Sequence, residues 1–263
     1  MRAGGVDFGI VQNISPLINR HHLREQVGAS AAGTYLVVGA PFDNGDNEGA
    51  IHFFAVNTDT STYVEVSVLA SAWATLNGYF GTAVAGAAAS NLFLVGAPNE
   101  DGPVVMSDEG VVYLYNASGT VTNAETTAQL TLLQIIGGEA DDDEFGTAVS
   151  LSADGQTAAV GAPGKSPNAV FFYEYDDKYD LSLVARVDQP SGGEDSDLFG
   201  STVGVSGGRL LVGAPYHDTP LNQAGAAFLY VGDGLSVCAA CLPRGGGVWV
   251  GVWVGMSVHF FFF

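Results

Sequence analysis

The sequence has little positive charge. Eight Lys and Arg stand against 28 Asp and Glu, which gives a formal net charge of −20 over 263 residues. A field of this sign repels phosphate backbones and anionic lipid headgroups, so it argues against binding to nucleic acid. It favours metal cations, cationic partners or simply solubility in salty surroundings.

Cysteines and helix-forming residues are also scarce. Cys238 and Cys241, the only cysteines, form a single Cys-Ala-Ala-Cys without the further ligands of a zinc site or the βαβ setting of a redox motif. Lys, Glu and Arg are few, whereas 36 glycines indicate many tight turns. With 47% apolar residues the chain can build a packed core, and this composition favours an all-β fold.

Two short words recur along the chain. Val-Gly-Ala-Pro occurs four times, at Val38 to Pro41, Val95 to Pro98, Val160 to Pro163 and Val212 to Pro215, with its glycines 57, 65 and 52 residues apart. Phe-Gly precedes three of these by 16, 16 and 14 residues, at Phe80, Phe145 and Phe199. Repeats of this length predict structural units that stack on copies of themselves.

Each repeat contains apolar runs of strand length between turn signals. The second repeat shows Thr82 to Ala87, Leu92 to Ala97, Val111 to Tyr115 and Gln129 to Ile135; the third shows Thr147 to Leu151, Thr157 to Ala162, Ala169 to Tyr175 and Leu181 to Val187. Four short antiparallel strands make one propeller blade, so we predict a β-propeller of about four blades over residues 27–233. The blades are expected near residues 27–72, 73–137, 138–190 and 191–233. The fourth is expected to stop after its third strand, Ala226 to Val231.

The turns and the recurring words have structural explanations. Two-residue hairpins are predicted at Ala32-Gly33, Ser90-Asn91, Asp154-Gly155 and Gly207-Gly208, because these residues tolerate positive φ. In Val-Gly-Ala-Pro, small residues should let a neighbouring blade approach and Pro should end the ladder, while the Phe of Phe-Gly should pack between blades. The blade-motif residues are Phe80, Gly81, Gly96, Pro98, Phe145, Gly146, Gly161, Pro163, Phe199, Gly200, Gly213 and Pro215.

Both ends of the sequence break the pattern. Residues 1–26 show no secretory signal, and Phe8-Gly9 stands too far from Gly39 to fit the repeat, which suggests an insertion or a gene-model error. Residues 234–263 form an aberrant hydrophobic tail. Its uncharged run 248–263 is slightly short for a membrane span; a strand or a translation artefact are the alternatives.

The paired words, with Gly110 to Tyr115 closing the blade, resemble the FG-GAP repeat of integrin α-chain propellers. The acidic loops before Phe-Gly, Glu139 to Glu144 and Glu194 to Asp197, make the chain more similar to the extracellular FG-GAP proteins of microbes. The resemblance implies a propeller that works outside the cell or at its surface in adhesion and ligand binding. Integrin-type propellers usually have seven blades, so further blades or a second copy are expected to complete this one.

Metal binding is the first chemistry to consider. The calcium loop of integrin blades is not carried over, because the matching turn of the third repeat offers only Asp154 and Ca²⁺ needs six to eight oxygens. Asp43, Asp46 and Glu48 form the best Ca²⁺ candidate, with a polar hairpin loop as the alternative. Asp141, Asp143, Asp195 and Asp197 form a weaker second set, with solvated loops as the alternative.

The sequence assigns no catalytic residue. Gly204 to Gly208 matches Gly-x-Ser-x-Gly around Ser206, but a strand rather than a helix is expected to follow it. His217-Asp218 has no evident nucleophile. Two sequons, Asn13-Ile-Ser15 and Asn116-Ala-Ser118, allow N-glycosylation, the second in a loop expected just after a third strand.

The sequence therefore predicts a non-enzymatic adhesion or ligand-binding module with a protein or glycan ligand and no nucleic-acid partner. The resemblance supplies this function, since a fold alone does not. Two alternatives remain open: an accessory or catalytic propeller of a phospholipase-like hydrolase, and a structural surface-layer protein.

Overall fold

The structure is a computed structural model of the 263-residue chain. It describes residues 27–29, 34–43, 46–87, 89–102, 108–164, 167–176, 180–190, 193–217, 225–231, 236–241, 249–254 and 257–262. For 27–29 and for the strands after residue 231 the description is limited to the backbone. Residues 1–26, including Phe8-Gly9 and Asn13, and the turn Ala32-Gly33 lie outside the described residues.

Almost all regular structure is β, arranged in four antiparallel sheets. The first sheet holds β1 (Val27–Ala29), β2 (Tyr35–Ala40), β3 (Ala50–Asn57) and β4 (Thr62–Ala70); the second holds β5 (Ala83–Gly86), β6 (Leu92–Ala97), β7 (Val111–Ser118) and β8 (Gln129–Gly137). The third holds β9 (Ala148–Leu151), β10 (Thr157–Ala162), β11 (Ala169–Tyr175) and β12 (Leu181–Asp188). The fourth begins with β13 (Thr202–Ser206), β14 (Arg209–Ala214) and β15 (Ala226–Val231). The described residues also contain one short 3₁₀ helix, η2 (Asp195–Asp197).

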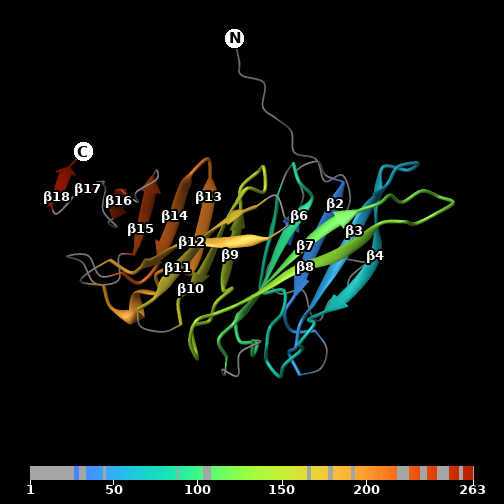
Figure 1. The fold of residues 1–263 in the computed structure, drawn as a ribbon, viewed down its shortest axis with the longest axis horizontal. Coiled ribbons are helices and arrows are strands. Elements are labelled where there is room, and N and C mark those ends of the chain that lie inside the picture. The colour runs from blue at the N-terminus through green and yellow to red at the C-terminus, as the bar shows by residue number, and fades with distance from the viewer. Residues whose placement is uncertain are drawn as a thin grey trace, which may run out of the picture.

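The sheets stand side by side in chain order, from the blue first sheet to the orange strands of the fourth (Figure 1). Their first strands contact one another in turn, β1 with β5, β5 with β9 and β9 with β13. Meandering four-stranded sheets that share a row of inner strands are the blades of a β-propeller. The predicted all-β propeller is confirmed, and in the described part the first and fourth sheets lie at opposite ends of an open row of blades (Figure 1).

The prediction that the fourth blade lacks a fourth strand is wrong. Residues Ser236–Cys241 form β16, which pairs antiparallel with β15, and β17 (Trp249–Val254) and β18 (Ser257–Phe262) extend the same sheet to six strands. The small uncharged side chains of the Cys-Ala-Ala-Cys stretch can enter a ladder although they lack the alternating pattern of a strand. Within the described part of the chain, no helix is long and apolar enough to cross a membrane.

Of the described turns between the first and second strands of a blade, only that of the fourth blade is the expected two-residue hairpin. There Ser206 pairs with Arg209, and Gly207 and Gly208 both have positive φ. In the second and third blades the ladder closes earlier, at Ala87 to Leu92 and at Ser152 to Thr157, so these turns have four residues. A β-bulge follows Phe53, Leu114 and Phe172, at matching positions between the third and fourth strands of three blades.

The phenylalanines of Phe-Gly are fully buried between consecutive blades. Phe80, Phe145 and Phe199 belong to three core clusters, each of which combines residues of the preceding blade with those of their own. Each ring meets an aromatic ring of its own third strand edge to face, with centroid distances of 5.1, 5.3 and 5.4 Å. These rings are the large apolar surfaces that a blade cannot bury without a neighbour.

The glycines of the two words touch across every described junction. Cβ atoms added to Gly39, Gly96 and Gly161 would each lie 2.9 Å from the carbonyl carbon of the Phe-Gly glycine of the next blade, and closer still to its oxygen. Those Phe-Gly glycines, Gly81, Gly146 and Gly200, have φ values of 93 to 96° and donate their N–H to the Gly-Ala-Pro glycine of their own blade at 3.0 Å. The words recur because backbone packs against backbone, which leaves no room for a side chain.

Candidate functional site

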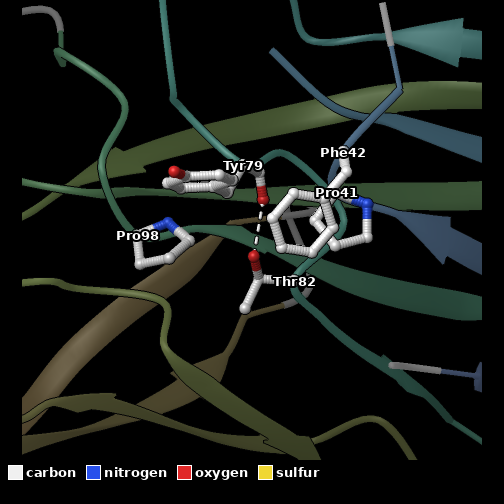
Figure 2. A pocket seen from close by; sticks show the side chains of 5 residues that line it. All are labelled: Pro41, Phe42, Tyr79, Thr82 and Pro98. Atoms are coloured by element: carbon white, nitrogen blue, oxygen red, sulfur yellow. Dashed lines mark hydrogen bonds between the residues drawn. The ribbon is translucent and has the colours of Figure 1, made fainter. Parts of the chain in front are cut away.

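A pocket opens at the GAP end of the blades, the end where the second strand finishes at Gly-Ala-Pro and the third begins. It lies between the first two blades, has a volume of about 250 Å³, and is lined by Pro41, Phe42, Tyr79, Thr82 and Pro98. Pro41 and Pro98 are the Gly-Ala-Pro prolines of adjacent blades, and Tyr79 and Thr82 flank Phe80-Gly81. Figure 2 shows the five side chains around the opening.

Two aromatic rings define this pocket. The rings of Phe42 and Tyr79 meet edge to face with centroids 5.4 Å apart. Tyr79 has a left-handed backbone, φ 54°, and its carbonyl accepts a 2.7 Å hydrogen bond from the Thr82 hydroxyl (Figure 2). The left-handed backbone of Tyr79 and the hydrogen bond to its carbonyl fix the conformation of residues 79–82, and the Tyr79 ring lines the pocket from there.

The other blade junctions carry different residues at these two positions. Phe42 follows the proline of its word, where the later repeats have Asn99, Gly164 and Tyr216; Tyr79 precedes Phe-Gly, where they have Glu144 and Leu198. The left-handed backbone recurs at the position of Tyr79, with φ 53° at Glu144 and 52° at Leu198. The scaffold of the pocket is therefore common to the repeats, whereas the pair of aromatic rings belongs to the first junction.

The structure does not gather the predicted metal ligands Asp43, Asp46 and Glu48 into one cluster. In the ranges that the structure describes, no group of three or more His, Cys, Asp or Glu is arranged to hold a metal ion. Instead, the chain from Asp46 to Glu48 accepts hydrogen bonds of 2.9 to 3.1 Å from the N–H groups of Asn77, Tyr79 and Phe80. The expected ligands thus belong to a segment that supports the wall of the pocket.

In the second acidic set, Asp143 and Asp197 hold the loops of their own blades by hydrogen bonds. The Asp143 carboxylate accepts hydrogen bonds from the N–H groups of Glu139 and Ala140, closing the loop before Phe145. Asp197, in the next blade, accepts from the N–H of Glu194 and the side chain of Gln189. Asp141 and Asp195 lie in these same loops. The four residues belong to two different blades and do not form a shared site.

His52 and His217 each pair with a carboxylate. Nδ1 of His217 lies 2.6 Å from Oδ2 of Asp197, and Nδ1 of His52 lies 2.7 Å from Oε1 of Glu65. Ser206, in the Gly-x-Ser-x-Gly match, ends β13 and leads into the turn to β14, so the helix that this motif needs in hydrolases does not follow it. Asp218 lies outside the described residues.

Sequence reasoning missed two buried carboxylates at the GAP end of the second blade. Glu100, two residues after Pro98, accepts a hydrogen bond from the hydroxyl of Ser71, which also lies 2.8 Å from the hydroxyl of Tyr113. Burial raises the pKa of Glu100, and these hydrogen bonds oppose the rise. Neither oxygen of buried Glu109 has a hydrogen-bond partner in the described structure. Burial, followed by the charges of nearby aspartates, raises the pKa of Glu109. The sequence signal that could have identified them is their position in the repeat. Glu100 follows Gly-Ala-Pro closely, and Glu109 directly precedes the glycine before the third strand.

Asn116 does not lie in a loop after the third strand, as the sequence suggested. Strand β7 runs to Ser118, so Asn116 stands inside it, half-buried, with Leu92 and Thr131 as its partners on either side. The sequence misplaced the end of the strand because Asn-Ala-Ser-Gly reads as a turn, whereas the hairpin ladder continues through it.

The sheets, the buried Phe-Gly rings and the glycine contacts define a β-propeller built from one repeated blade. The model of the FG-GAP repeat family matches residues 189–230, which include β13, β14 and all but the last residue of β15. The same two words recur in register in the other blades, so the chain contains an FG-GAP repeat and is built from blades that carry the same words.

Comparison with known proteins adds two remote similarities of fold. No curated protein matches the sequence. The β-propeller domain of the Trilobed protease from Pyrococcus furiosus, described as having an open velcro topology, is 10% identical with a TM-score of 0.41 over 90% of this chain and 65% of its own. Trypanosoma rangeli sialidase in complex with the inhibitor DANA is 11% identical with a TM-score of 0.44 over 92% and 54%. This chain therefore spans about two thirds and about half of those two chains.

Proposed function

We propose that this FG-GAP propeller is a non-enzymatic recognition module, acting outside the cell or at its surface in adhesion or ligand binding. The observation that carries the proposal is the pocket at the GAP end, where Phe42 and Tyr79 face each other between two blades. Aromatic rings held at the mouth of a rigid scaffold offer large contact area at a small cost in side-chain entropy.

The chemistry around the pocket supports binding rather than turnover. Its five lining residues include two prolines, a phenylalanine, a tyrosine and a threonine, and none is a usual general base. The Thr82 hydroxyl already donates to the Tyr79 carbonyl, so it is not poised as a nucleophile.

The rival function is a hydrolase, and the observation that favours it is the His217–Asp197 pair. A base oriented by a buried carboxylate is part of many hydrolytic sites. However, the imidazole ring of His217 has Asp197 as its partner among the described hydrogen bonds. No hydroxyl of Ser or Thr and no thiol of Cys is bonded to the ring there. The ring also meets Phe228 edge to face at 5.6 Å, which fits a histidine used in packing.

Two assays on the full chain test the proposal. The first measures hydrolysis of generic ester and phosphodiester substrates by the wild type and His217→Ala. The second screens a glycan array and a displayed peptide library with the wild type and Phe42→Ala. We expect no turnover and at least one ligand class whose binding depends on Phe42. Robust hydrolysis abolished by His217→Ala would overturn the proposal, and so would the lack of any Phe42-dependent ligand in both libraries.

A further inference from the structure

The pocket between the first two blades is small and largely apolar. At about 250 Å³ it falls below the roughly 300 to 1,000 Å³ typical of sites for whole small molecules, and suits one large side chain. The polar groups of its lining side chains are the hydroxyls of Tyr79 and Thr82, and the Thr82 hydroxyl already donates to the Tyr79 carbonyl. A sugar ring or a guanidinium placed inside would leave hydroxyls or N–H groups without partners, which is costly in a desolvated pocket.

The surroundings of the pocket carry one sign of charge. Residues 27–137, which form the first two blades, contain ten Asp and Glu and no Lys or Arg. Asp43 follows Phe42 directly, and exposed Asp46 lies on the segment paired with Asn77, two residues before Tyr79. On the other side, exposed Asp101 follows Pro98 by three residues. Acidic residues therefore adjoin the lining residues of the pocket in both blades.

We propose that this pocket binds a basic segment of a partner protein, in which an aliphatic or proline side chain enters the pocket and packs against the Phe42 and Tyr79 rings, and flanking Lys or Arg residues pair with the acidic residues that adjoin the lining. The inference rests on the recognition role proposed above and adds the chemistry of the ligand. The apolar side chain supplies the part of the binding free energy that persists at high salt. The flanking charges raise the association rate and supply the part of the binding free energy that salt weakens.

Three synthetic 12-residue peptides test the inference by fluorescence anisotropy. The first has a central Leu-Pro-Leu flanked by Lys and Arg; the second keeps the flanks and replaces the centre by Ser-Gly-Ser; the third keeps the centre and has Glu flanks. We expect the first to bind at least tenfold more tightly than either of the others, and its affinity to fall several-fold when salt rises from 50 to 300 mM.

Matched variants locate the contact. Phe42→Ala should weaken the first peptide about tenfold, whereas Tyr216→Ala, at the same repeat position in the fourth blade, should leave it unchanged. Should Phe42→Ala lose its cooperative thermal transition, a pair of exposed charge reversals gives the answer. Asp46→Lys at the pocket should weaken binding several-fold, and Glu125→Lys, in the loop at the opposite end of β7, should not.

Three results would overturn the inference. One is equal affinity for the first and second peptides, which would mean attraction by net charge alone. Another is an equal loss of affinity for the first peptide in Phe42→Ala and Tyr216→Ala, or in Asp46→Lys and Glu125→Lys. The third is no measurable binding of the first peptide. A glycan bound in a Phe42-dependent way would then refute the basic-peptide class and keep the recognition role, so the two failures are distinguishable.

Discussion

Replacing the glycine of Gly-Ala-Pro by alanine tests the packing that holds the blades together. At Gly96 the new Cβ would lie 2.9 Å from the carbonyl carbon of Gly146 and closer to its oxygen, both backbone atoms of the next blade. Backbone cannot rotate away as a side chain can, so the blades must separate. Overpacking typically costs about 1 to 3 kcal/mol, and we expect Gly96→Ala to reach the upper end, about 3 kcal/mol.

The fourth blade supplies the matched control. The same substitution at Gly213 meets the hydroxyl of Thr202, a side chain that can change rotamer, so its cost should stay below about 1 kcal/mol. At roughly 2 to 4 °C per kcal/mol for a chain of this size, the melting temperatures of the two variants should differ by several degrees. Urea unfolding followed by circular dichroism gives the free energies. Equal destabilisation by Gly96→Ala and Gly213→Ala would refute the backbone-contact explanation of the repeat.

Three further measurements follow from single side chains. Tyr35→Phe removes the 2.6 Å hydrogen bond from the Tyr35 hydroxyl to the Gly119 carbonyl and should cost about 1 kcal/mol of unfolding free energy; no loss would mean that this contact between blades is not formed. Glu109→Gln should stabilise the protein by about 1 kcal/mol at pH 7 and have little effect near pH 4, because a carboxyl whose folded pKa is raised loses stability as pH rises above its unfolded pKa; an equal effect at both pH values contradicts this. Asn116 should remain unmodified when the chain is secreted from a glycosylating host, because it is half-buried in a central strand; mass spectrometry showing a glycan there would refute that placement.

The pocket illustrates where sequence reasoning stopped. Phe42 and Tyr79 are 37 residues apart and belong to different repeats. Their rings meet because the end of one Gly-Ala-Pro word and the start of the next Phe-Gly word occupy adjacent places at one blade junction. Each residue alone looks like a variable loop position, so the sequence offered the acidic loop nearby as the site instead.

The strands after Val231 and the acidic loops are further features that the sequence did not reveal. The abrupt change of composition after Gly234 concealed the pairing of β16 with β15, because cross-strand hydrogen bonds do not require the alternating pattern that identifies a strand. Similarly, the carboxylate of Asp143, which lies close to other acidic residues in the sequence, accepts hydrogen bonds from backbone N–H groups of its own loop.

The sequence alone determined the repeated blade, since Gly39, Gly96 and Gly161 recur with their Phe-Gly partners wherever two backbones must touch. Such a steric requirement acts on the residue itself and therefore remains visible in the order of amino acids. The tertiary structure decided the rest: which variable residues meet at the GAP end, and which carboxylates are buried. Those properties depend on distances between blades, which residue order does not encode locally.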